Sequence, residues 1–223
     1  MGPVIGEILP LSLGIAISPM PIMATIVMLL SPRAKATSLA FLIGWTCGIA
    51  ITLTAFALLS TLMPRGGFST PRVLTGVLEI LVGTLMLVLA VRQWRHRPTA
   101  GEAVPIPRWL RAIDSLTPPR GLAIGFVYSA FRPKNLLITL AAGIVIGGSG
   151  LPVVPSSIAV AVFTAFAAAA IAAPIVAYFT GQPRITTKLE EVRDLLLRNV
   201  GTITSTALLF LGVVIIGMGI ATL

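Results

Sequence analysis

Charge is scarce in this chain, and so are the residues that soluble enzymes use for chemistry. Only 10% of the 223 residues are charged, whereas soluble domains carry about 25%. A single cysteine, Cys47, excludes an internal disulfide and a Cys-X-X-Cys redox pair, and the single histidine, His96, builds no metal site alone. No phosphate-binding loop or hydrolase constellation is present in the sequence. We therefore expect a protein that is not an enzyme and that uses no cofactor or metal.

Apolar residues take the place of the missing charge. They make up 56% of the chain, and the mean hydropathy is +1.01. Six runs are long enough to cross a hydrocarbon core of about 30 Å. We expect an all-α polytopic membrane protein with six transmembrane helices, at about residues 4–30, 37–62, 72–91, 121–147, 154–180 and 200–223.

The basic residues are distributed unevenly between the loops. Twelve of the sixteen lysines and arginines follow the first, third and fifth runs, and only Arg65 and Arg72 lie on the other side. The positive-inside rule then predicts a plasma-membrane protein with both termini extracytoplasmic. The first 32 residues contain no lysine or arginine, so we expect a retained first span and no removable signal peptide. The net charge of +9 favours contact with anionic membrane lipids, and no basic-aromatic run indicates nucleic-acid binding.

Prolines interrupt two of the six runs. Pro19 and Pro21 lie in the first run, and Pro133 lies in the fourth, between Arg132 and Lys134. Proline removes a backbone donor and disfavours helix at the residue before it. We expect the first and fourth spans to be broken at these prolines, the alternative being two ordinary spans with a proline kink.

The paired breaks predict an internal repeat. Aligning Pro19 with Pro133 overlays the two broken spans, and each is followed by a short loop and two more spans. We therefore divide the chain into a first three-span repeat at 1–91, a cytoplasmic loop at 92–120 and a second three-span repeat at 121–223, inverted relative to the first. Residues 107–116 of the loop have helical apolar spacing, which fits either an interfacial helix or a solvated linker.

Three ionisable side chains lie within predicted spans: Glu79, Arg132 and Lys134. A charge at such a depth costs at least ~2.5–3.5 kcal/mol and usually has a function. Counting residues from the predicted span ends gives Glu79 a depth that overlaps with both cations, so that an ion pair with either one is within reach. Such a pair leaves one positive charge for an anionic substrate group, or it merely locks the third span to the fourth.

We predict a substrate-binding or coupling site that contains Lys134, Arg132, Glu79, Asn135 and Ser18. Lys134 is the strongest candidate, because a buried ammonium readily loses its proton and so can take part in proton coupling. Glu79 is a candidate proton carrier. Asn135 and Ser18 stand beside the breaks, where they either bind substrate or satisfy the backbone groups that the prolines free.

Several segments resemble those of one known family, in order along nearly the whole chain. They are residues 18–22 (SPMPI), 28–34 (MLLSPRA), 42–45 (LIGW), 92–98 (RQWRHRP), 108–109 (RW) and 132–136 (RPKNL). The chain resembles the peptidoglycolipid- or sulfolipid-addressing (GAP or Sap) proteins of the lysine-exporter (LysE) superfamily. Members of that superfamily are similar small six-span exporters with an Asn-Pro-Lys-like motif in the fourth span. Here Arg132 stands where the asparagine usually stands, which adds a cation.

The resemblance implies a role in moving lipids or glycolipids across the plasma membrane of bacteria with complex envelopes. Together with the charges, it favours a secondary transporter, an exporter or flippase, of an anionic lipid or glycolipid, with its site between the two broken helices. Two alternatives stay open. One is a LysE-type exporter of a small solute such as an amino acid or ion, and the other is a non-transporting adaptor that recruits lipid-synthesis or export partners. Small residues in the last two spans also permit a homodimer.

Overall fold

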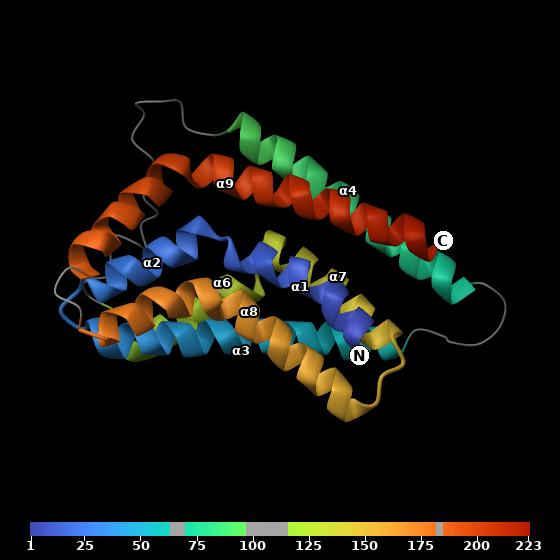
Figure 1. The fold of residues 1–223 in the computed structure, drawn as a ribbon, viewed down its shortest axis with the longest axis horizontal. Helices are drawn as coiled ribbons and strands as arrows, with labels where there is room; N and C mark the ends of the chain where they lie inside the picture. The colour runs from blue at the N-terminus through green and yellow to red at the C-terminus, as the bar shows by residue number, and fades with distance from the viewer. Residues whose placement is uncertain (63–69, 97–115, 182–184) are drawn as a thin grey trace.

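A computed structural model describes residues 1–62, 70–96, 116–181 and 185–223, and this part of the chain is helical, without a strand. Within these ranges eight helices follow one another (Figure 1): α1 (Gly2–Ala16), α2 (Pro19–Leu29), α3 (Ala34–Thr61), α4 (Thr70–Arg95), α6 (Pro118–Ala130), α7 (Pro133–Gly148), α8 (Val153–Phe179) and α9 (Ile185–Thr222). The segment 107–116, for which the sequence permits an interfacial helix, lies largely outside the described residues.

Length and apolar composition make four of these helices candidate membrane spans: α3, α4, α8 and α9. The remaining four form two bent pairs, α1 with α2 at 55° and α6 with α7 at 63°. The number of spans is therefore four, or up to six if each bent pair counts as one. The two breaks predicted from the prolines are present, and the chain is a multi-pass membrane protein.

The backbone explains why the breaks lie where they do. Ser18 and Arg132, each directly before a proline, are extended, with φ/ψ of −124°/99° and −73°/128°. Proline disfavours helix at the preceding residue but fits the first position of a new helix, so α2 begins at Pro19 and α7 at Pro133. Pro10 and Pro174 lie inside the continuous helices α1 and α8, so a proline alone does not make a break in this chain.

Two helices are longer than predicted. The sequence predicts a last span that begins at residue 200, after a separate charged segment, but α9 runs without interruption from Ile185 to Thr222. Polarity changes near residue 200 while the backbone hydrogen bonding continues, because a charged sequence forms helix as readily as an apolar one. Likewise α4 continues to Arg95, beyond the predicted end of the third span.

The helices pair in a reciprocal pattern. α3 packs mainly against α6 and α7, α8 packs mainly against α1, and α4 packs along α9. Figure 1 shows α4 and α9 as a separate pair along one side of the other helices. Thus α1 and α2 together contact mainly α8, which follows the second break. In the same way α6 and α7 contact mainly α3, which follows the first break.

Glycines allow the closest of these contacts. In the α4–α9 pair, a Cβ on Gly76 would lie 2.7 Å from the Gly219 oxygen, and one on Gly83 would lie 2.8 Å from the Gly212 oxygen. Between α3 and α6, a Cβ on Gly44 would collide with the Leu122 carbonyl. Small residues at helix crossings are the usual basis of helix packing in membranes. The hydrophobic effect contributes little to helix association there, because lipid tails are as apolar as the side chains.

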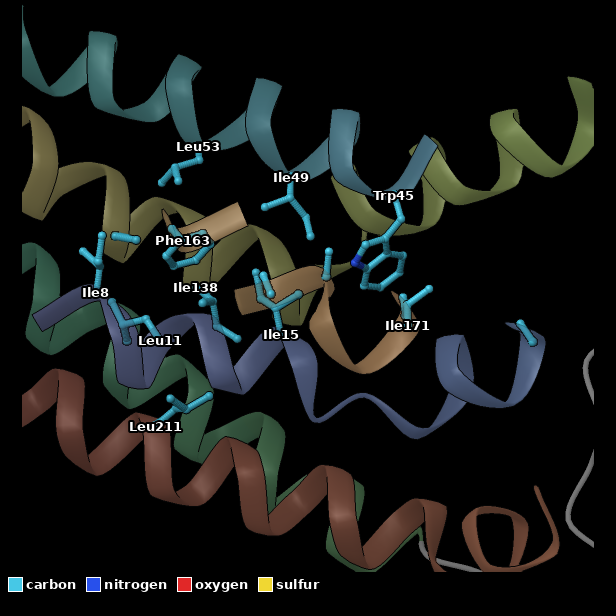
Figure 2. Close-up of a cluster of buried hydrophobic side chains, with 14 of the residues drawn as sticks. Ile8, Leu11, Ile15, Trp45, Ile49, Leu53, Ile138, Phe163, Ile171 and Leu211 are labelled. Carbon is cyan, nitrogen blue, oxygen red and sulfur yellow. The ribbon is translucent and has the colours of Figure 1, made fainter. Parts of the chain in front are cut away.

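A buried apolar cluster fixes α1 directly before its break. Figure 2 shows Ile8, Leu11 and Ile15 of α1 facing side chains of α3, α7, α8 and α9. The largest of these are Trp45 and Phe163, which are fully buried. The end of α1 is therefore held on several sides, so that the backbone at Ile17 and Ser18 has a defined position.

Gly44→Ala is expected to destabilise the protein by about 1–3 kcal/mol, because the new methyl meets backbone atoms of α6 that cannot rotate away. Gly217→Ala is the matched control, since a Cβ there meets nothing within 4 Å. Unfolding in detergent measures both variants. Equal stability of the two variants would contradict the close α3–α6 contact.

Candidate functional site

The side chain of Lys134 connects the two breaks. It belongs to the first turn of α7 and is only 5% exposed. Its Nζ donates hydrogen bonds to the Ile17 carbonyl oxygen at 3.1 Å and to Ser18 Oγ at 2.9 Å. Lys134 and Ser18, which the sequence predicts as site residues for separate reasons, are therefore direct partners across 116 positions of the chain.

The Ile17 carbonyl accepts this bond because Pro21 leaves it free. In a continuous helix the carbonyl of residue 17 would accept from the amide of residue 21, but proline has no N–H. The next carbonyl, that of Ser18, does receive its helical bond, from the Ile22 amide at 3.4 Å. Pro21 thus creates a buried acceptor, and the Lys134 ammonium satisfies it.

Asn135 does the same at the second break. The Ser129 carbonyl would accept from residue 133, which is also a proline. Instead Asn135 Nδ2 donates to this oxygen at 3.2 Å. Asn135 is fully buried, and its Oδ1 has no hydrogen-bond partner within the described residues. Of the two roles considered for Asn135 and Ser18, Asn135 thus satisfies the backbone at its break, whereas the Ser18 hydroxyl accepts a hydrogen bond from Lys134, which itself satisfies the Ile17 carbonyl.

Arg132 has a different direct partner from Lys134. It is partly exposed, and its guanidinium carbon lies 4.9 Å from the centre of the Tyr128 ring. Tyr128 precedes Arg132 by four residues. Because α6 ends at Ala130 and Arg132 is extended, this contact is made across the break and is not an i, i+4 pair within one helix.

The ion pair considered between Glu79 and one of the two cations does not form. Glu79 is 4% exposed, and the Thr222 hydroxyl near the end of α9 lies 3.2 Å from its Oε2. Over the described ranges, the one salt bridge joins Arg193 to Asp194. Glu79 faces α9 because α4 packs along α9, whereas Lys134 faces the first break. Residue counts estimate the depth of these side chains and contain no information on their direction.

Two cavities adjoin the Lys134–Ser18 contact. An apolar cavity of about 410 Å³ is lined by Ser18 and Pro19 at the first break, by Phe166 of α8, and by Leu196 and Ile203 of α9. A cationic cavity of about 320 Å³ is lined by Lys134 and Arg132 at the second break, by Arg92 and His96 at the end of α4, and by Thr204 of α9. Both volumes lie in the range of small-molecule sites.

Arg92 and His96 are site residues that the sequence does not predict. They belong to a basic segment after the third apolar run, and their approach to Arg132 depends on how α4 packs, which spacing along the chain does not reveal. Within the described part of the chain no group of three or more His, Cys, Asp or Glu side chains is positioned to hold a metal ion.

The family model described as Sap, sulfolipid-1-addressing protein, matches residues 8–221, nearly the whole chain. The chain belongs to this family. The description of the Sap family names a lipid, and it indicates a role in lipid export or addressing. No curated protein and no solved structure matches this Sap family member.

Ser18→Ala is expected to cost about 1.5–3 kcal/mol of stability, because the buried Lys134 ammonium loses one of its two acceptors. Ser12→Ala is the control. Ser12 is equally buried, but its hydroxyl bonds only the Leu9 carbonyl within its own helix. Unfolding of both variants in detergent measures the difference. Equal losses would show that the contact between the breaks stabilises the protein no more than a hydrogen bond within one helix does.

Proposed function

We propose that this chain is a secondary transporter, an exporter or flippase, that moves an anionic lipid or glycolipid across the plasma membrane. One observation carries the proposal: Lys134 joins two broken helices, with an apolar cavity on one side and a cationic cavity on the other. Broken helices that meet around a charged side chain are how secondary transporters build substrate sites. Membership of a lipid-addressing family supports a lipid as the substrate.

The same proposal includes six spans arranged as two inverted three-helix repeats. The similar bends of 55° and 63° and the reciprocal pairing of α3 with α6–α7 and of α8 with α1 support it. The distribution of lysine and arginine supports an orientation with both termini extracytoplasmic. Substrate would then bind near the bilayer midplane, where the two repeats meet.

Lys134 is the element that changes partner during transport. An anionic group entering the cationic cavity competes with the Ile17 carbonyl and Ser18 for the ammonium. Once the ammonium turns to the substrate, the first break loses its link to the second, and the half-helices α1 and α2 become free to change their angle. Substrate binding is thereby coupled to movement at a hinge.

The apolar cavity favours a lipid over a small polar solute, because a polar solute would lose its hydrogen bonds to water against the apolar side chains of Phe166, Ile203 and Leu196.

The adaptor alternative requires a different part of the chain. Deletion of residues 98–115 would abolish the function of an adaptor that recruits partners through this loop. A transporter that works through Lys134 is expected to retain export after the same deletion.

Lys134→Met is expected to lower export at least about tenfold, because a charge-assisted hydrogen bond contributes about 1.5–3 kcal/mol and the variant has no ammonium to offer. The assay compares anionic lipids of the inner and outer leaflets in a strain that lacks the protein and carries each variant. Lys188→Met, which removes an exposed lysine of α9, is the control. Normal export by Lys134→Met, at equal membrane levels, would refute the site assignment.

Glu79→Gln is expected to remove the response of export to an imposed pH gradient. Glu79 is a buried carboxyl that makes no salt bridge within the described residues, and glutamine mimics its protonated form. The measurement is export by cells before and after a protonophore is added. Glu190→Gln, at an exposed acid of α9, should respond as the wild type does. An unchanged response of Glu79→Gln would exclude Glu79 as the proton carrier.

A further inference from the structure

Four basic side chains meet at the cationic cavity from elements far apart in the sequence. Arg92 and His96 are one helical turn apart at the end of α4, so both lie on the same face of that helix. Arg132 and Lys134 come from the second break. Among the described residues no carboxylate lines the cavity, so the positive charge of this group has no acidic counterpart in that lining.

The chemistry of this lining suits a tetrahedral oxyanion. Arginine presents a planar fork that binds sulfate or phosphate through two parallel hydrogen bonds, and lysine adds a point charge. Thr204 and Gln93 contribute neutral donors to the same lining. A volume of about 320 Å³ lies in the range of small-molecule sites, which is enough for such a group and its link to a larger molecule.

The cationic cavity also lies next to the apolar cavity, as two pairs of adjoining residues show. Consecutive residues of α9, Ile203 and Thr204, line the apolar and the cationic cavity respectively. Lys134 lines the cationic cavity, and its partner Ser18 lines the apolar one. A ligand that occupies both spaces carries its charge at one end and hydrocarbon at the other.

We propose that the cationic cavity binds the sulfate or phosphate headgroup of an amphiphilic lipid, and that Arg92 and Arg132 select this group. The inference deepens the proposed function and rests on it for the assignment of the lipid as a transported substrate. It adds a part of the site that lies outside the two breaks, namely the last turn of α4.

Binding of a matched pair of lipids to the purified full-length protein tests the inference. The probes are 1-oleoyl lysophosphatidate and 1-oleoylglycerol, which differ only in the phosphate. We expect lysophosphatidate to bind at least about tenfold more tightly, since a charge-assisted hydrogen bond of about 1.5–3 kcal/mol corresponds to that factor or more. Equal affinity of the two lipids would overturn the inference.

Variants locate the binding. Arg92→Gln and Arg132→Gln should each weaken lysophosphatidate binding about tenfold and leave 1-oleoylglycerol binding unchanged. Arg95→Gln is the matched control, because Arg95 is an exposed arginine at the same end of α4 that does not line the cavity. Equal effects of Arg92→Gln and Arg95→Gln would mean that general surface charge attracts the lipid, and would refute the site.

Inorganic phosphate distinguishes a headgroup from a free anion. If it displaces lysophosphatidate only at concentrations far above that of the lipid, the cavity recognises a headgroup joined to a chain. Displacement at equal concentration would assign the cavity to a free anion and overturn the lipid inference.

The two proposals fail in different experiments. If Lys134→Met abolishes export while Arg92→Gln binds lysophosphatidate as the wild type does, the proposed headgroup site is wrong. The proposal that the protein is a transporter is then still supported. If Arg92→Gln and Arg132→Gln weaken binding while Lys134→Met exports normally, the protein binds anionic lipid without transporting it through this site.

Discussion

The hydrogen bond from the Lys134 ammonium to the Ile17 carbonyl depends on a missing donor. Pro21 has no N–H for that carbonyl, and Pro133 likewise leaves the Ser129 carbonyl without its helical partner. An unpaired carbonyl in a nonaqueous interior costs several kcal/mol, so each break requires a side-chain donor. Lys134 and Asn135, adjacent in α7, supply these donors, and each break is thereby fixed to the first turn of one helix.

The positions of the two breaks could be predicted because the effect of proline on its neighbours is local. Pro19 and Pro133 stand at helix starts for this local reason, and Asn135 satisfies a carbonyl six residues before it, but the donor at the first break, Lys134, comes from the other break. The direction of Glu79 could not be predicted in this way. A count of residues along a span gives depth, while the direction of a side chain follows from helix packing, and α4 packs along α9.

The cationic cavity could not be predicted from the sequence, for a related reason. Arg92 and His96 read as part of a basic loop, because nothing in their spacing connects them with Arg132 some forty residues later. The close glycine contacts that position α4 against α9 could not be predicted from the sequence either. Gly76 and Gly83 are seven residues apart, as are Gly212 and Gly219, and this matched spacing gains meaning only when the two helices are known to be neighbours.

The length of α9 has a mechanical consequence. The path along its 38 residues measures roughly 57 Å at 1.5 Å per residue, nearly twice the ~30 Å thickness of a hydrocarbon core, and Figure 1 shows that the first part of the helix bends away from the rest. Leu196 and Ile203, which line the apolar cavity, lie in the first half of this helix, next to its charged turns. Because the backbone hydrogen bonding of α9 is continuous from Ile185, a displacement of Leu196 at the cavity also moves the charged turns at Lys188 and Glu191.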